Sequence, residues 1–283
     1  MQKFFLCALL AMAVSSPAQA QFAYDFNTSQ EDVNAKFTST GDISNNWQAA
    51  GGVGDTGRLA GEPGAILGTF WKTGYSTLST ADSSVFLAVS FQARVGESSG
   101  AGSAGNVAVG ISDTSTGSTF QSGSNTFFSL NLNGAANNQS LLQIQYRDAS
   151  GSTGGTQTAA SSGALTLANN EWYQLRATFN RVDAGSLSIT NASLWSLGVD
   201  GTATPTALGS TLSSGNITNL NTLENASSVF YGFAMGQLNG GGAKAIDNFS
   251  AIAVPEPSSA ILGLCGIGLL FGFRRARQLA SLR

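Results

Sequence analysis

Residue types that usually carry enzyme chemistry are scarce in this chain, which contains no histidine. Without histidine, neither a Ser-His or Cys-His mechanism nor a His-ligated metal site is available. Residues 96–100 match the G-x-S-x-G pattern, and residues 100–105 match G-x-G-x-x-G. The first pattern needs a helix after it and a histidine base, and the second needs a βαβ unit. Predicted strands flank both stretches, so we expect a loop there.

Paired carboxylates can hydrolyse glycosides without histidine, but no convincing pair is present. Glu31 and Asp32 are adjacent and would point to opposite sides of a strand, whereas Glu97 and Glu224 fall in expected loops. We therefore expect no catalytic activity. A carbohydrate-active enzyme with an unrecognised carboxylate pair remains the alternative.

Oxygen-rich side chains near the two ends of the body suggest a calcium site. Asp25 and Asp247 lie on terminal segments that we expect to pair as strands, beside Asn27 and Asn248. Carboxylate and amide oxygens of this kind are calcium ligands. The alternative is that these residues form Asx-turns and satisfied carboxylates at strand ends.

Aromatic side chains offer flat apolar surfaces on which sugar rings can stack. Trp47 and Trp71 fall near turn-rich stretches, and Tyr146 lies at a strand end, so these three are the carbohydrate-binding candidates. Core packing is the alternative role for each of them. Trp172 and Trp195 lie inside strongly apolar strands, where we expect core packing.

The body of the chain shows the period-two alternation of β-strands. In residues 84–95, Val85, Leu87, Val89 and Phe91 fall on one face. Further strands are expected at residues 22–26, 107–111, 127–132, 141–146, 171–181, 186–197, 229–238 and 243–252. Turn-forming residues separate these runs, and no stretch has a capped helical stripe. The sequence therefore predicts one all-β domain over residues 21–253, an antiparallel β-sandwich.

Two features of this body resemble concanavalin A-like (laminin-G-like) jelly rolls. Residues 171–179 (EWYQLRATF), the turn at 182–185 and residues 186–189 look like the central hairpin of that fold. Residues 22–26 and 245–249 look like its paired terminal strands. The resemblance implies a jelly-roll module that binds carbohydrate or serves in surface adhesion, although some such modules are glycosidases. The E-x-D-x-x-E-like spacing of those glycosidases is absent here.

The first twenty residues contain the three parts of a secretory signal peptide. Lys3 supplies the positive charge, and residues 4–14 form an almost unbroken apolar run. Ala18 and Ala20 are the small residues that precede a signal-peptidase site. We therefore expect signal peptidase to cut between Ala20 and Gln21.

Residues 254–283 form a second signal with three parts. Its motif consists of Val254, Pro255, Glu256 and Pro257, and its basic end consists of Arg274, Arg275 and Arg277. Between them, residues 260–273 are uncharged and apolar, and a helix there would span roughly 21 Å at about 1.5 Å per residue. Because arginines after an apolar helix mark the cytoplasmic side, we expect a short transmembrane helix with the body outside.

The order of motif, apolar helix and basic end resembles the PEP-CTERM sorting domain. Its members are exported proteins of Gram-negative bacteria, and exosortase, a membrane-embedded protease, is thought to cut their tails near the motif. The resemblance implies an inner-membrane precursor that reaches the cell surface or the extracellular space, often with exopolysaccharide or biofilm material. An ordinary C-terminal anchor that is never cleaved is the alternative.

Composition narrows the range of partners. Outside the two signals, eight basic and fifteen acidic residues leave the body near a net charge of −7. Nucleic acid is not expected to bind, because phosphate recognition requires clustered Lys and Arg. Both cysteines, Cys7 and Cys265, lie in the signals, so the body folds without disulfides.

These observations together predict an exported, non-catalytic protein of the cell surface or extracellular matrix. We expect exopolysaccharide as the ligand of its β-sandwich. A purely structural matrix protein with no small ligand is a further alternative, in addition to the enzyme.

Overall fold

The computed structural model describes most of the body of the chain. The described residues are 21–39, 46–60, 66–71, 83–94, 106–114, 126–135, 139–147, 156–183, 186–218, 220, 223, 229–238 and 241–254. The expected signal peptide (1–20), the tail after Val254 and its expected transmembrane helix (260–273) lie outside these residues. Within the described residues, no helix is long and apolar enough to span a bilayer.

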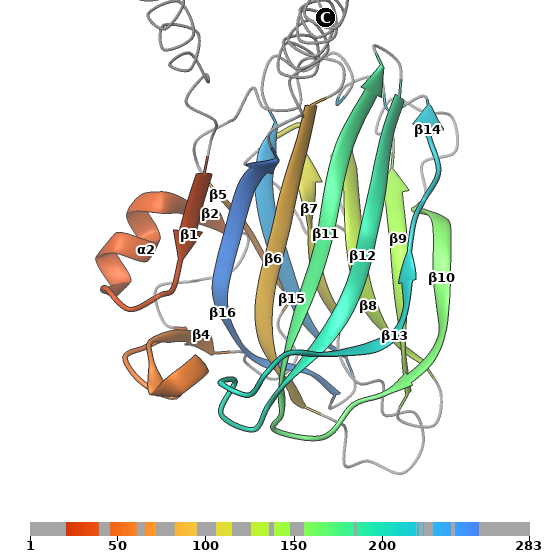
Figure 1. The fold of residues 1–283 in the computed structure, drawn as a ribbon. Coiled ribbons are helices and arrows are strands. Elements are labelled where there is room, and N and C mark those ends of the chain that lie inside the picture. Colours follow the sequence, from red (N-terminus) through yellow and green to blue (C-terminus); the bar gives the residue numbers. More distant parts are fainter. Residues whose placement is uncertain are drawn as a thin grey trace, which may run out of the picture.

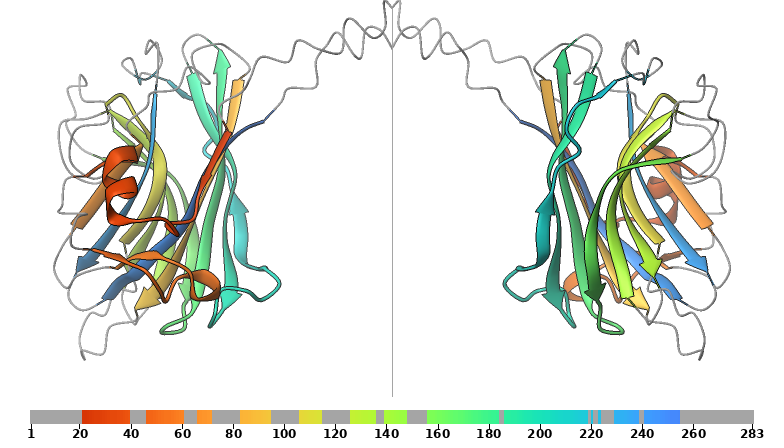
Figure 2. Two further views of the ribbon diagram at one scale, coloured as in Figure 1. Left: turned by 90° about the vertical axis from the view of Figure 1, so that its left-hand side faces the viewer. Right: turned by 90° about the vertical axis from the view of Figure 1, so that its right-hand side faces the viewer.

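Two antiparallel sheets pack face to face as the layers of a sandwich (Figures 1 and 2). The front sheet, which faces the viewer in Figure 1, has the strand order β1-β16-β6-β11-β12-β13. Its main strands are β1 (Gln21–Tyr24), β6 (Ser83–Arg94), β11 (Trp172–Asp183), β12 (Ser186–Gly198), β13 (Thr206–Leu212) and β16 (Gly241–Val254). The short strands that extend it are β3 (Trp47–Gln48), β4 (Arg58–Ala60) and β14 (Ile217–Thr218).

The back sheet has the strand order β10-β9-β8-β7-β15-β5-β2. Its strands are β2 (Phe37–Ser39), β5 (Ile66–Trp71), β7 (Asn106–Ser112), β8 (Phe127–Ala135), β9 (Gln139–Arg147), β10 (Gln157–Thr166) and β15 (Phe230–Leu238). Neighbouring strands in both sheets run antiparallel. The prediction of an all-β antiparallel sandwich is therefore confirmed.

The hydrophobic core lies between the sheets and follows the alternation of the strands. From β6 it takes Val85, Leu87, Val89 and Phe91, all of them buried, as the sequence pattern predicted. The back sheet contributes Val107, Val109, Ile111, Phe128, Leu130, Leu132, Tyr231 and Phe233. Because each strand turns alternate side chains to this core, the remaining side chains form the two outer faces of the sandwich.

The two terminal strands of the body pair with each other. In the β1–β16 ladder, Gln21 lies opposite Ile252 and Tyr24 lies opposite Phe249. The predicted pairing of the terminal segments is therefore confirmed, as is the hairpin formed by β11 and β12. The described chain begins and ends at the same end of the sandwich.

One helix corrects the sequence prediction, which had placed none in the body. Helix α2 (Gln30–Lys36) begins after Ser29, whose hydroxyl accepts the N–H of Asp32 at 3.2 Å as an N-cap. Glu31 and Asp32 therefore lie in the first turn of a helix, where acidic residues are favourable, and not on a strand. Only Val33 of this helix is buried, so no apolar stripe was visible in the sequence.

Candidate functional site

The residues that the sequence singled out fall in separate parts of the sandwich. Asp25, Trp47 and Asp247 lie near one another, where the turn after β1 meets the β3–β4 segment and β16. Trp71 lies on β5 and Tyr146 lies on β9, both in the back sheet. The five candidates therefore do not converge on one site, although Trp47 lies near the two calcium candidates.

Asp247 is a fully buried carboxylate that ties β16 to the loop between β3 and β4. Its Oδ2 accepts hydrogen bonds from the backbone N–H of Val53 at 2.8 Å and from the hydroxyl of Thr56 at 3.0 Å. Its Oδ1 accepts the backbone N–H of Asn248 at 2.7 Å. Burial raises the pKa of Asp247 to about 6, and the three donors oppose this rise.

These surroundings do not fit a calcium ion held between Asp25 and Asp247. Calcium is bound by oxygen atoms, whereas hydrogen-bond donors already face both oxygens of Asp247. Asp25 is exposed and accepts bonds from the backbone N–H and side-chain amide of Asn27, at 3.2 and 2.9 Å, as in an Asx-turn. Among the described residues, no three His, Cys, Asp or Glu side chains converge as metal ligands.

The three aromatic candidates are partly buried against the core. The indole Nε1–H of Trp47 donates to the carbonyl of Phe26 at 2.8 Å, and the ring of Trp71 stacks on Phe22 with centroids 4.2 Å apart. Tyr146 packs against the core from the inward side of β9. These contacts give each ring a structural role, so carbohydrate binding by Trp47, Trp71 and Tyr146 stays a prediction.

A different set of polar residues gathers on the outer side of the back sheet. This set, which we call the amide face, consists of Ser129, Asn131, Asn133, Gln143 and Gln145. The first three alternate along β8 with the core residues Phe128, Leu130 and Leu132 and therefore point outward. In the β8–β9 ladder, Ser129 lies opposite Gln145, and Asn131 lies opposite Gln143. The amide groups of two neighbouring strands are therefore side by side.

Hydrogen bonds join the amide face into a network. Gln143 is its centre, because its Oε1 accepts from the side-chain amides of Asn133 at 2.6 Å and Gln145 at 2.9 Å. The amide of Asn131 donates to the hydroxyl of Ser129 at 2.8 Å. Asn131 is fully buried, and its Oδ1 has no hydrogen-bond partner among the described residues, so one strong acceptor on this face is unsatisfied within that part of the chain.

Small residues continue the amide face toward the middle of the back sheet. Gly110 lies opposite Ser129, and Ala108 lies opposite Asn131 in the β7–β8 ladder. On the next strand, Gly232 and Ala234 lie opposite Gly110 and Ala108. Because these four residues have no side chain beyond Cβ, the sheet presents little side-chain bulk beside the amides.

Polar alternation in the sequence marks the amide face. Ser129, Asn131 and Asn133 are spaced two apart, and so are Gln143 and Gln145. A search for carboxylates and aromatic platforms misses these residues, although their spacing places them on one side of each strand. Chemically, an amide offers both a donor and an acceptor, as a sugar hydroxyl requires.

Comparisons with known proteins agree with this architecture and with the tail. The PEP-CTERM protein-sorting motif matches residues 253–278. A search of curated proteins found no matching sequence. The sorting motif indicates export through a membrane-anchored precursor to the cell surface.

Solved structures of plant lectins have a similar fold. Lectin UEA-II complexed with galactose is 13% identical with a TM-score of 0.53, covering 83% of this chain and 99% of that chain. Basic winged bean lectin with Tn-antigen is 13% identical with a TM-score of 0.52, covering 83% and 98%. Lectin II from Ulex europaeus is 12% identical with a TM-score of 0.50, covering 83% and 99%. The chain is therefore an exported protein that carries a PEP-CTERM sorting motif behind a concanavalin A-like β-sandwich of the kind found in legume lectins.

Proposed function

We propose that the mature protein is a non-catalytic glycan-binding protein of the cell surface or extracellular matrix, with the amide face as its binding surface. The observation that carries this proposal is the unsatisfied Oδ1 of Asn131, buried among amides and a hydroxyl. Because this oxygen is buried, a sugar hydroxyl would reach it only after the contacts at the exposed edge of the face open, and that hydroxyl could then also accept from a neighbouring amide.

The amide face has an accessible edge through which a glycan can reach it. Asn133 and Gln143 are partly exposed, and the Gln143 amide donates to the exposed Ser161 hydroxyl on β10 at 3.4 Å. The hydrogen-bonded groups therefore extend from the exposed Ser161 on β10 to Gln143 and then Gln145 on β9. We propose that a sugar first replaces the Ser161 contact and then hydrogen-bonds to Gln143 and Asn133.

The chemistry of the face favours binding over hydrolysis. Glycoside hydrolysis needs a pair of carboxyl groups beside the scissile bond. The amide face consists of one hydroxyl and four amides and carries no carboxyl group. Lectins in complex with galactose and with Tn-antigen share the fold, which adds support to a binding role.

The tail determines where the protein would bind its glycan. We propose that signal peptidase releases Gln21, and that an exosortase-type protease recognises Val254 to Pro257 and removes the segment after it. The released body would then associate with exopolysaccharide at the cell surface. A purely structural matrix role would use the same route but needs no glycan ligand.

A glycan array with the full chain in detergent tests the binding proposal. We expect binding to neutral hexose-containing glycans, and we expect Gln143→Met to weaken it at least tenfold, because methionine keeps the length of the side chain but loses both hydrogen-bonding groups. Gln30→Met removes an amide from helix α2, on the opposite side of the molecule, and should bind as the unmodified chain does (Figure 1).

Three results would contradict the proposal. If no glycan of any kind binds, the structural alternative is favoured. If a glycan is instead cleaved, and cleavage disappears when an Asp or Glu is replaced, the enzyme alternative is correct. Equal binding by the Gln143→Met and Gln30→Met variants would remove the amide face from the interaction.

A further inference from the structure

A second polar surface lies on the outer side of the front sheet, where an arginine stacks on a tryptophan. The guanidinium carbon of Arg176 on β11 lies 4.7 Å from the ring centroid of Trp195 on β12. Its Nε–H donates to the side-chain oxygen of Gln174, whose own amide donates to Ser90 on β6 at 3.1 Å. The arginine is therefore held in place by neighbours on two strands.

A β-bulge turns Trp195 to this outer side. Leu187 and Ile189, at odd positions of β12, face the core, but after Asn191 the even-numbered Ala192 and Leu194 face it. Asn191 has a φ of 54°, and the β11–β12 register shifts between Arg176 and Thr178. The extra residue reverses the alternation, so Trp195 points outward and its Nε1–H donates to Ser193 at 2.9 Å.

Within the described part of the chain, Arg176 lacks a carboxylate partner for its charge. No carboxylate of the described residues pairs with its guanidinium, and its outward neighbours on β11 and β12 are uncharged. These neighbours are Gln174, Thr178, Asn180, Ser188, Thr190, Ser193 and Trp195. Partial burial lowers the pKa of Arg176, because the charge is drawn away from water. A partly desolvated cation without a partner attracts an anion more strongly than a fully solvated one.

The free part of the arginine has the geometry of a carboxylate receptor. Its Nε–H is used by Gln174, while the two terminal NH2 groups have no hydrogen bond within the described part of the chain. A planar guanidinium binds a planar carboxylate through two parallel hydrogen bonds, and stacking on an aromatic ring orients that plane. The hydroxyls and amides around it suit a ligand with many hydroxyl groups.

We propose that the outer side of the front sheet around Arg176 and Trp195 binds a carboxylate-bearing sugar unit, such as a uronate, of an acidic polysaccharide. The carboxylate lies on the terminal NH2 groups of Arg176, and sugar hydroxyls contact Thr178 and Ser193 beside it. This inference rests on the proposed glycan-binding function, because it assigns an acidic glycan to the same protein. The surface is separate from the amide face, which lies on the other sheet (Figure 2).

Binding of polygalacturonate to the full chain in detergent tests this site. The unmodified chain should bind polygalacturonate more tightly than neutral galactan or polyglutamate. Arg176→Met should weaken polygalacturonate binding at least tenfold. Arg176→Lys should retain only part of the affinity, because lysine cannot form two parallel hydrogen bonds to a carboxylate. Arg147→Met, which removes an arginine from the back sheet, is the matched control and should keep the affinity of the unmodified chain.

The outcomes separate this inference from the proposed function. Gln143→Met should keep polygalacturonate binding even if neutral glycans never bind, so the amide face can fail while the arginine site stands. Equal losses in the Arg176→Met and Arg147→Met variants would mean general charge attraction and overturn the site. Stronger binding of polyglutamate would point to an acidic peptide instead. If circular dichroism shows that Arg176→Met does not fold, the Arg176→Lys and Trp195→Phe variants test the site instead. Unchanged polygalacturonate affinity in both of these variants would overturn the site.

Discussion

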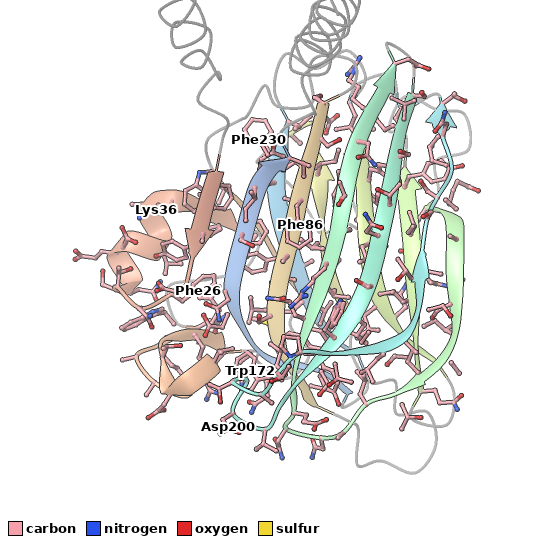
Figure 3. The ribbon with its side chains drawn as sticks, in the orientation of Figure 1. Phe26, Lys36, Phe86, Trp172, Asp200 and Phe230 are labelled. Carbon is pink, nitrogen blue, oxygen red and sulfur yellow. The ribbon has the colours of Figure 1, made fainter. Side chains whose placement is uncertain are left out.

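The carboxylate of Asp247 accepts a 2.8 Å hydrogen bond from the backbone N–H of Val53, although the two residues are 194 positions apart. Val53 also packs against a small cluster formed by Trp172, Leu197 and Ala245. Figure 3 shows Trp172 and Asp200 at the same end of the front sheet. The loop between β3 and β4 therefore closes this end of the sheet, and Asp247 holds the loop in place.

Stability should depend on pH through Asp247. Its pKa is about 6 in the folded chain, against about 3.9 in an unfolded chain. Between these values the folded state binds the proton more tightly, so the free energy of unfolding should fall as pH rises from about 4 to about 6. The total change is on the order of 2–3 kcal/mol. Urea unfolding at several pH values measures it.

Two variants test whether Asp247 is the group responsible. Asp247→Asn should remove the pH dependence between about 4 and 6, because no proton is taken up there. Asp25→Asn should move the dependence to lower pH, since the charge of Asp25 contributes to the raised pKa of Asp247. An unchanged pH profile in Asp247→Asn would assign the effect to another residue.

Calcium should have no measurable effect on the thermal stability of the body through Asp25 and Asp247. Donors already face the oxygens of Asp247, and the described residues offer no cluster of metal-binding side chains there. Melting curves in EDTA and in calcium chloride measure this directly. A stabilisation by calcium that disappears in Asp25→Asn would restore the calcium site expected from the sequence.

Gly52→Ala should destabilise the loop that covers Asp247. A Cβ atom at Gly52 would lie 2.5 Å from the carbonyl oxygen of Gly57 and 2.6 Å from Oδ2 of Asp247, so the loop must shift. We expect a loss of about 1–3 kcal/mol in chemical denaturation. Gly163→Ala on β10 is the control, because nothing lies within 4 Å of its Cβ, and it should stay within about 0.5 kcal/mol. Similar midpoints for both variants would contradict this packing.

The mature protein should lack both signals. Intact mass of protein from the native host should correspond to a chain that starts at Gln21, ends near Pro257 and lacks residues 260–283. Replacing Pro255, Glu256 and Pro257 with alanine should keep the full-length form in the inner membrane. If the native protein retains Arg274, Arg275 and Arg277, the sorting hypothesis is wrong and the tail is an uncleaved membrane anchor.

Strands with one side in the core were predictable from the sequence. Residues 84–95 and 107–111 were expected as strands, and the structure has them at Ser83–Arg94 and Asn106–Ser112. The edge strands β10 and β13 were missed. All residues of β10 and β13 are exposed or partly exposed, and many are small, so no apolar alternation marks them.

The positions of individual side chains were harder to predict, for two physical reasons. Trp195 was expected in the core, but the bulge at Asn191 places it outward, and a single extra residue leaves no clear mark in an apolar sequence. The partners of Asp247 are distant in the chain, so only the folded sandwich brings Val53 and Thr56 to its carboxylate. The sequence could place Asp247 on a terminal strand. It could not show whether the carboxylate binds a metal or accepts hydrogen bonds from a loop.

The position of β16 also determines how the body would resist pulling. β16 leads directly into the tail and is bonded on both sides near its end, with Ile252 opposite Gln21 of β1 and Phe86 of β6. If the tail held the protein to a membrane while the body held a polymer, tension would act along β16. The ladder hydrogen bonds lie across that direction, so many must break together rather than one after another. Under that tension the body would be loaded in shear, with many hydrogen bonds sharing the force.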